Sequence, residues 1–358
     1  MNQEDINQKI GLHNAFWNRE VLKRPLVSFQ LDDYFVSKRI KAAAHLLTDG
    51  KHITPEMLHV DSLMEDFERM FQESCQTGQD AFWVGEPFCG IPWMEAIFGC
   101  DIYGTKSSFI SHPCIESAQD LKKIQFDPDN AWYRKYFEFV DKLNTLSAGR
   151  FPIGQPIMRG ASDVVGALLG QMELVYAFAD EPEVIQEAFF KVMNALRSVI
   201  KSQWDATMDF HGGYSMGFYH VWCPNKCIWF QEDLSALLSP QIYNDFLREP
   251  DASVCKGYDY AAVHLHPASF FILDMYMQME GLKAIQINKD VGGPSVKDMM
   301  PYFLKVLASK NLIIYGDLDE GEIDCILEEL PRKGTFLNIT VETVERAKEL
   351  MEHIESKC

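Results

Sequence analysis

The sequence predicts an α/β protein folded as a (β/α)8 TIM barrel, and three observations lead to this prediction. Eight short apolar runs alternate with helical patterns along the 358 residues. The runs are almost continuously hydrophobic, as expected for parallel strands that are buried on both faces. The motifs G-x-G-x-x-G and G-x-x-x-x-G-K-[ST], which bind phosphate in open nucleotide-binding sheets, are absent. A doubly wound open sheet is therefore the less favoured alternative.

The first half of the chain contains three of the predicted strands. Residues 1–24 form a polar helical lead-in, and Thr54-Pro55 marks a helix start because proline suits the first turn. Methionine and phenylalanine residues recur at helical spacing over residues 57–71. Ser162 is a plausible N-cap for the helix after the third strand. The predicted strands here are Leu26–Leu31, Ala81–Gly85 and Phe151–Ile157.

The second half contains the other five strands, most of them followed by a helical pattern. A long helix over residues 181–209 precedes them, and residues 341–356 form the last helix. The segment between His220 and Asp233 is interpreted as a loop. Neither a repeat nor a low-complexity linker divides the chain, so residues 1–358 are predicted to be one domain. The predicted strands are Gly212–His220, Ala261–His266, Ala284–Asn288, Leu312–Gly316 and Thr335–Ile339.

Composition narrows the class of protein. The net charge is -19, and no block of five basic residues occurs, which argues against nucleic-acid and anionic-membrane partners. No apolar run approaches the ~20 residues that cross a bilayer, and the N-terminus lacks a signal-peptide pattern. The nine cysteines are scattered and odd in number, which favours reduced thiols. We expect a cytoplasmic enzyme that acts on a small molecule.

The sharpest candidate site is a pair of histidines at the end of the fifth strand. His264 and His266 are two residues apart, so in a strand they face the same side. His220 and Cys223 follow the fourth strand, which is the neighbour in a sequential barrel. Imidazole and thiolate together suit zinc, so we predict His264, His266 and Cys223 as metal ligands. The alternative for His220 is a buried ring bonded to a backbone carbonyl.

Other polar residues follow the strands where a barrel places its active site. Glu86, Asp32 and His220 are the catalytic candidates, because carboxylates and imidazole transfer protons. Asp32 could instead cap the following helix, and the same alternative applies to Asp317. Arg159 could bind a carboxylate with both nitrogens or form an ordinary ion pair. The predicted substrate-binding residues are Arg159, Gln155, Gln286, Asp317 and Trp222.

Several segments, in order and spacing, resemble the uroporphyrinogen decarboxylase superfamily. They are GIPWMEAIFGC (90–100), HPCIESAQDLKKIQFDPDN (112–130), FPIGQPIMRGASDVVGALLG (151–170), EDLSALLSPQIYNDFLREP (232–250) and IIYGDLD (313–319). The resemblance implies the TIM barrel and a homodimer. True uroporphyrinogen decarboxylases carry R-Q-A-G-R-Y after the first strand, where this chain has the acidic QLDDYFVSKR (30–39).

The resemblance is closer to the cobamide-dependent methyltransferase branch of that superfamily. That branch carries H-x-C on the fifth strand and uses zinc to activate a thiol; here the motif is His264-Leu265-His266. The resemblance implies methyl transfer between a corrinoid, on a partner protein, and a thiol or pterin. Cys223, Glu320 or a water would complete the zinc site. The alternatives are a lyase that decarboxylates a smaller or unusual substrate, and a non-catalytic corrinoid or tetrapyrrole binder.

Overall fold

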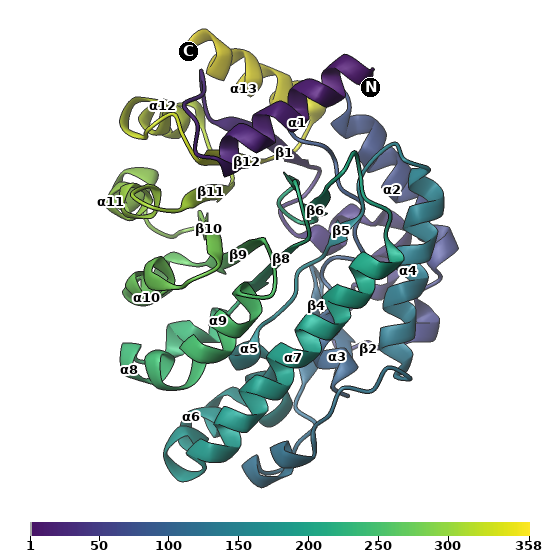
Figure 1. Ribbon diagram of the computed structural model, residues 1–358. Helices are drawn as coiled ribbons and strands as arrows, with labels where there is room; N and C mark the ends of the chain where they lie inside the picture. The colour runs from purple at the N-terminus through teal and green to yellow at the C-terminus, as the bar shows by residue number, and fades with distance from the viewer. Residues whose placement is uncertain (1) are drawn as a thin grey trace.

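In the computed structural model, which describes residues 2–358, six parallel strands form the central sheet (Figure 1). Their order is β1-β12-β11-β10-β9-β8, and every neighbouring pair is parallel. Almost every residue in them is buried, because helices cover the outer face of the sheet. The strands are β1 (Leu26–Leu31), β8 (Cys227–Gln231), β9 (Tyr260–Leu265), β10 (Leu282–Asn288), β11 (Asn311–Gly316) and β12 (Thr335–Val341).

Helices follow each strand from β8 to β12. Three of them begin at side-chain caps: Ser295 before α11, Asp319 before α12 and Thr343 before α13. The elements are the 3₁₀ helix η5 (Asp233–Leu237), α8 (Pro240–Ile242), the π-helical turn η6 (Tyr243–Leu247), α9 (Arg248–Cys255), the 3₁₀ helix η7 (Pro267–Ile272), α10 (Leu273–Gln278), α11 (Val296–Leu307), α12 (Glu320–Glu329) and α13 (Val344–Ser356).

The chain between β1 and β6 is mainly helical and carries a small antiparallel sheet of three strands. Its strands are β2 (His52–Ile53), β3 (Asp101–Gly104) and β4 (Phe109–His112). Its α-helices are α2 (Val60–Ser74), α3 (Trp93–Ile97), α4 (Ala131–Ser147), α5 (Ala161–Leu169), α6 (Gln171–Asp180) and α7 (Pro182–Ala206). Its 3₁₀ helices are η1 (Val36–Arg39), η2 (Lys41–Leu46), η3 (Pro55–Met57) and η4 (Ala118–Lys123).

Two predicted strands are much shorter than expected. Residues 81–85 contribute one bridge, Gly85 to Ile153, and residues 151–157 contribute β5 (Gly154–Gln155). Beside β1, side chains replace part of the backbone pairing. Asp80 accepts a hydrogen bond from the Val27 amide at 2.8 Å, and Gln79 accepts one from the Phe29 amide at 2.7 Å. These segments are buried although they form little regular sheet.

The predicted fourth strand, Gly212–His220, is instead the first part of a hairpin. Its strands are β6 (Tyr214–Met216) and β7 (Val221–Cys223), and β6 pairs with β5. The hairpin packs tightly at Gly217, where an added Cβ would lie 2.4 Å from the Gln155 carbonyl oxygen. On the side away from β10, β9 pairs with β8, which lies in the segment interpreted as a loop. The fourth strand end is therefore Gln231, followed by residues 232–233.

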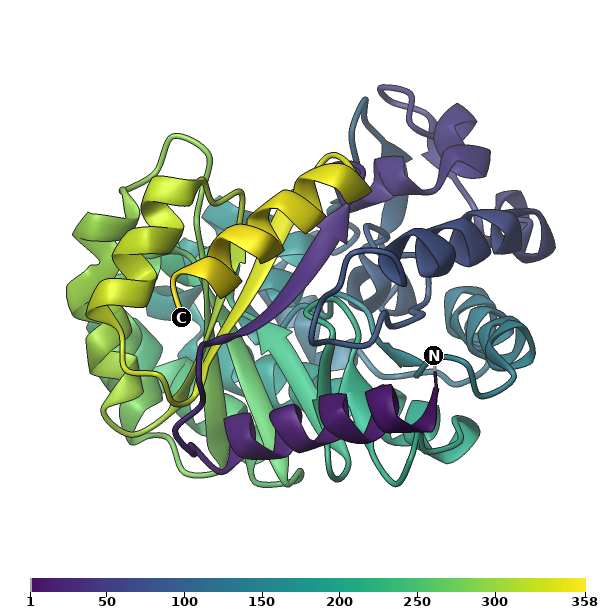
Figure 2. The ribbon, with the colours of Figure 1, turned by 90° about the horizontal axis from the view of Figure 1, so that it is seen from above.

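The N-terminal lead-in contains one helix, α1 (Gln3–Trp17), which lies across one end of the sheet (Figure 2). The indole of Trp17 donates to the Trp222 carbonyl at 2.8 Å and ties α1 to β7. At the edge of the sheet, Arg159 forms a parallel bridge with Gln231 of β8. The whole arrangement is consistent with a TIM-barrel-like fold. No helix within residues 2–358 combines the length and the apolar character that a membrane crossing requires.

Candidate metal centre and its pocket

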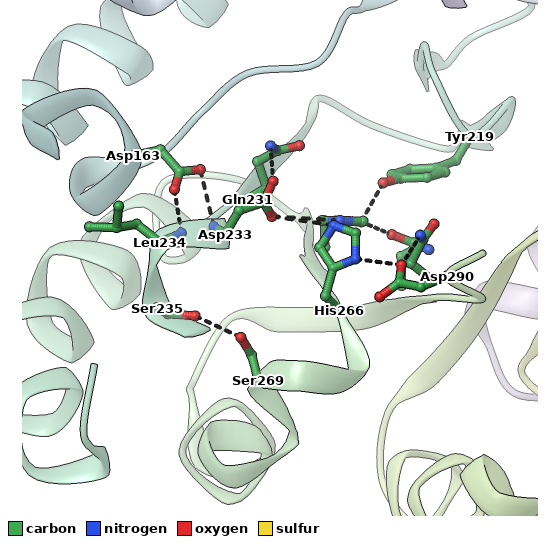
Figure 3. Close-up of polar contacts among 12 residues, drawn as sticks. Asp163, Tyr219, Gln231, Asp233, Leu234, Ser235, His266, Ser269 and Asp290 are labelled. Carbon is green, nitrogen blue, oxygen red and sulfur yellow. Dashed lines mark hydrogen bonds and ion pairs between the residues drawn. The ribbon is translucent and has the colours of Figure 1, made fainter. Parts of the chain in front are cut away.

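Asp233, His264 and His266 meet where β8 and β9 end. Figure 3 shows Asp233 and His266 of this group together with Asp290. The Nε2 atoms of His264 and His266 lie 3.7 and 3.8 Å from Oδ1 of Asp233. All three ligand-type atoms lie within 4.8 Å of one another. Within residues 2–358 this is the one group of three or more His, Cys, Asp or Glu side chains with the spacing to hold a metal ion. His264 is the penultimate residue of β9, and His266 directly precedes η7.

A second set of side chains orients these three groups. Nδ1 of His266 donates to Asp290 Oδ1 at 2.6 Å, and Nδ1 of His264 donates to Gln286 Oε1. The Tyr219 hydroxyl also lies 2.9 Å from Nδ1 of His264. With the proton held on Nδ1, Nε2 of a neutral ring directs its lone pair toward Asp233; His264 can do so directly, and His266 can do so after its ring loses its second proton. This is the arrangement that metal-ligating histidines generally show.

Two buried carboxylates hold the backbone that carries Asp233. Asp163 accepts from the Leu234 amide at 2.7 Å and from the Asp233 amide at 3.1 Å. Glu232, which directly precedes Asp233, accepts a hydrogen bond from the Ala161 amide at the start of α5, at 2.6 Å. Gly160 leaves the space for this contact, since a Cβ there would lie 2.0 Å from Glu232 Oε1. Gln231 then fixes the Asp233 side chain by donating to Oδ2 at 2.6 Å.

The two histidines differ in their protonation equilibria. Burial lowers the pKa of His264 and keeps its ring neutral, with Asp233 acting in the opposite direction. Burial also disfavours the charged form of His266, but its hydrogen bond with Asp290 and the charge of Asp233 outweigh this effect, so its pKa is raised. Nearby, burial and the charge of Asp233 raise the pKa of Asp163 to about 8. The neutral ring of His264 can bind a metal ion directly. His266 must release a proton before it can bind the ion.

A cavity of about 220 Å³ opens beside the three groups. Its aromatic side chains come from the segment after β1, from the hairpin and from β11, and include Tyr34, Phe218 and Tyr315. Arg159 also lines it, with Nη1 at 2.7 Å from Oε1 of the fully buried Glu95. A second cavity, of about 520 Å³, is lined by Asp233 and Arg159 as well. The group can therefore be approached from two cavities.

The predicted substrate-binding residues lie in different parts of the molecule. Arg159 lines both cavities, and Gln286 lies behind His264 as its hydrogen-bond partner. Gln155 is fully buried and bonds both to the backbone amide and to the carbonyl of Trp229. Trp222 packs under α1 and donates to the Phe210 carbonyl at 2.9 Å. Asp317 is exposed, and its carbonyl accepts from Lys289 at 2.6 Å.

The other predicted residues do not join Asp233, His264 and His266. Cys223 is fully buried in β7, where its thiol is 3.7 Å from the Val221 carbonyl oxygen. Glu86 and His220 line a separate cavity, which shares only Val36 with the pocket beside the histidines. Asp32 has a positive φ of 84° and lies 3.4 Å from Arg69 and 3.6 Å from Lys41.

Three residues of the site were not assigned to it from the sequence: Asp233, Asp290 and Tyr219. Asp233 is not placed at a strand end by the sequence, because the segment that contains β8 is interpreted as a loop. The buried run CIWFQ before Glu232-Asp233 is the pattern that could have revealed this strand end. Asp290 follows the predicted sixth strand. Tyr219 reaches His264 through the hairpin, a contact for which local sequence carries no pattern.

Comparisons with known proteins reveal the fold. No protein-family model matches the sequence. No curated protein is similar to it in sequence. A methyltransferase from Methanosarcina mazei has a similar solved structure, with a TM-score of 0.67 over 98% of both chains and 14% sequence identity. The two proteins therefore share a fold over their whole length.

Proposed function

We propose that the protein is a metal-dependent methyltransferase that moves a methyl group between a corrinoid and a small thiol or pterin. In this proposal Asp233, His264 and His266 bind zinc. The main support is that the Nε2 atoms of His264 and His266 and a carboxylate oxygen of Asp233 lie close together in the lining of one pocket. The likeness to a methyltransferase is one of fold, so methyl transfer is proposed by analogy of fold.

The three side chains fit zinc in chemistry and spacing. Nitrogen and oxygen ligands about 2.0–2.2 Å from a tetrahedral zinc lie about 3.3–3.6 Å apart. The separations of 3.7 and 3.8 Å from Asp233 Oδ1 are close to this range. Three protein ligands leave a fourth position for a substrate, as in catalytic zinc sites. Zinc in this position would supply Lewis acidity, lowering the pKa of a bound thiol or polarising the group that carries the methyl.

The two cavities supply places for two reactants. Methyl transfer requires donor and acceptor to meet with the methyl group between them. The pocket of about 220 Å³ suits a small molecule, and the wider cavity of about 520 Å³ borders the same Asp233 and Arg159. We assign the small molecule to the first and the approach of the corrinoid to the second. Aromatic side chains around the first cavity would exclude water from the reacting groups.

The alternative reaction, decarboxylation, has less support. A lyase for carboxylated substrates needs cations that are free to bind carboxylates. The guanidinium of Arg159 is already paired with Glu95 at 2.7 Å. The neighbouring charge of Glu95 raises the pKa of Arg159 further, despite its burial. The carboxylates of Asp233 and Asp290, which lie beside His266, would repel a substrate rich in carboxylates.

The experiment combines metal analysis with a transfer assay. Protein purified without chelator is expected to contain about one zinc per chain. Methylcobalamin mixed with this protein and a thiol or a reduced pterin should lose its absorbance bands as the methyl group leaves the cobalt. His266→Ala should lose both zinc and transfer. His59→Ala removes an exposed histidine and should retain both.

Two results would contradict the proposal. One is wild-type protein without stoichiometric metal even after incubation with zinc. The other is metal-independent release of carbon dioxide from small carboxylic acids, which would favour the lyase. Zinc binding without transfer to any thiol or pterin would retain the metal centre and reject the acceptor class.

A further inference from the structure

A third, smaller cavity lies beside β1, apart from the pocket at the histidines. It has a volume of about 50 Å³ and lies between β1, η1, α2 and the segment that follows residue 81. The turn of the β6–β7 hairpin supplies one side through His220. This is the part of the structure where β1 and residues 81–85 form no regular backbone pairing.

Three buried polar atoms of the lining residues have no hydrogen-bond partner within residues 2–358. They are Nη2 of Arg39, Oε2 of Glu86 and Nδ1 of His220. Arg39 and His220 are 7% and 5% exposed, and Glu86 retains slightly more exposure although its Oε2 is buried. Buried polar atoms without partners are rare in folded proteins, and three in one cavity indicate a ligand or ordered solvent.

Arg39 has only neutral partners among the described residues. Its Nε donates to the Asp33 carbonyl at 2.8 Å, and Nη1 donates to Gln30 Oε1. Neither partner is an anion, and no carboxylate of residues 2–358 forms an ion pair with this guanidinium. A buried cation without a counter-ion is unfavourable, because its hydration is lost and no opposite charge replaces it.

At neutral pH the cavity contains one positive charge, that of Arg39, because the other titratable groups that face Glu86 are uncharged. Burial raises the pKa of Glu86 to about 8, against the effects of the Cys89 hydrogen bond and the Arg39 charge. Burial lowers the pKa of His220 to about 3, so its ring is neutral. The pKa values of the Cys89 thiol and the Tyr136 hydroxyl are raised by burial, so both stay protonated. Protonated Glu86, neutral His220 and Arg39 can all donate hydrogen bonds.

We propose that this cavity binds a small monovalent anion, a simple carboxylate or a halide, between Arg39, Glu86 and His220. Arg39 supplies the counter-charge, and the other two residues donate hydrogen bonds. The volume holds a few water-sized atoms, which suits formate or bromide and excludes larger substrates. The bound anion joins β1 to the segment after residue 81, where backbone pairing is missing. The proposal does not depend on the reaction catalysed at the histidines.

Bromide and formate are the probes. Wild-type crystals grown without halide and soaked in bromide should show an anomalous peak between Arg39, Glu86 and His220, and formate should displace it. Calorimetric titration should show formate binding at pH 7 that weakens about tenfold by pH 9, since about a tenth of a group with a pKa near 8 stays protonated there. Above its pKa, Glu86 is ionised and repels the anion.

Two variants separate the roles of charge and hydrogen bonding. Arg39→Gln should weaken formate binding at least about tenfold, because the counter-charge is lost. Glu86→Gln keeps a neutral donor, so its affinity at pH 7 should stay within about threefold and its decline toward pH 9 should disappear. Water alone at the wild-type position after the bromide soak would overturn the proposal, whatever the variants show. Equal loss of binding in both variants would also overturn it.

Discussion

The strands β8 to β12 form a continuous parallel ladder with β1. Between β1 and β8, however, parallel pairing is limited to isolated bridges and the two-residue pairing of β5 with β6. Each neighbouring pair in the ladder is joined over five or more residues. By contrast, Gly85 with Ile153 and Arg159 with Gln231 are single bridges. The molecule therefore contains a regular region and an irregular region, and the two contribute differently to the site.

The regular region carries the groups that could bind the metal ion and most of the groups that orient them. His264 is the penultimate residue of β9, Gln286 lies in β10, and Asp233 and Asp290 follow β8 and β10. The cavity lining comes largely from the irregular region, including Tyr34, Phe35 and residues 90–92. Regular strands fix the positions of ligand side chains precisely enough for metal coordination. Loops can change in shape, and with them the substrate specificity can change. Metal binding and substrate choice should therefore respond to different substitutions.

The largest expected effect is loss of metal on removing a ligand from the regular region. Asp233→Asn should weaken zinc binding by about 3–4 kcal/mol, roughly a quarter of the binding free energy of a four-ligand zinc site. The measurement is competition with a zinc-binding dye. Cys223→Ala is the matched comparison: this buried residue of β7 lies outside the group, so its zinc affinity should equal that of the wild type. If Cys223→Ala weakened zinc binding and Asp233→Asn did not, the ligands would be His264, His266 and Cys223, as predicted from the sequence.

The next effect concerns α1, which contacts both regions. His13 is fully buried and packs against Phe82 from the irregular region and Phe336 from β12. Burial lowers its pKa to about 4. The unfolded chain binds a proton near pH 6.5 and the folded chain does not, so folding stability should fall by up to about 3 kcal/mol as the pH drops from 6.5 to 4.

Urea unfolding of the wild type and of His13→Gln over this pH range measures the contribution. The difference in unfolding free energy between the two proteins should shrink as the pH falls, because the variant lacks the titrating ring. A difference that does not change with pH would mean that His13 is accessible to protons in the folded state.

The strands of the regular region were predicted from the sequence more accurately than those of the irregular region. β1 has the predicted bounds, and the predicted strands at β9 to β12 differ from the observed ones by a few residues. Their apolar runs are buried on both faces, a property that residue type records directly. The spacing of His264 and His266 also indicated that the rings share a face, and their centroids are 4.5 Å apart.

The irregular region depends on contacts between distant parts of the chain. Gly212–His220 has the composition of a strand, but its position depends on the backbone of Gln155 lying close to Gly217. The pairing beside β1 uses the side chains of Gln79 and Asp80, which have no sequence pattern of their own. Misplacing the fourth strand placed His220 and Cys223 beside the two histidines, made Cys223 a predicted zinc ligand and left Asp233 out. The error in one strand therefore decided the predicted ligand set.

A smaller effect is expected from a residue that orients a ligand without binding metal. Asp290→Asn keeps the shape of the side chain but removes the charge that holds Nδ1 of His266. Zinc affinity should fall about 10–100-fold, as found for comparable partners of metal-bound histidines. Asp259→Asn removes an exposed acidic charge and controls for net charge. Equal affinities in the two variants would show that His266 is positioned by the backbone alone.

The smallest effect is expected in the irregular region, at the rim of the pocket. Phe35 lines the cavity and is 46% exposed, so Phe35→Ala removes apolar contact without disturbing the ladder. The KM for the small substrate should rise about 3–10-fold, equivalent to about 1 kcal/mol of lost contact, while zinc content stays at the wild-type level. Tyr176→Ala, an exposed aromatic of α6, should change neither quantity. If Phe35→Ala lowers the zinc content instead, the two regions are coupled, and the irregular region takes part in holding the metal ligands.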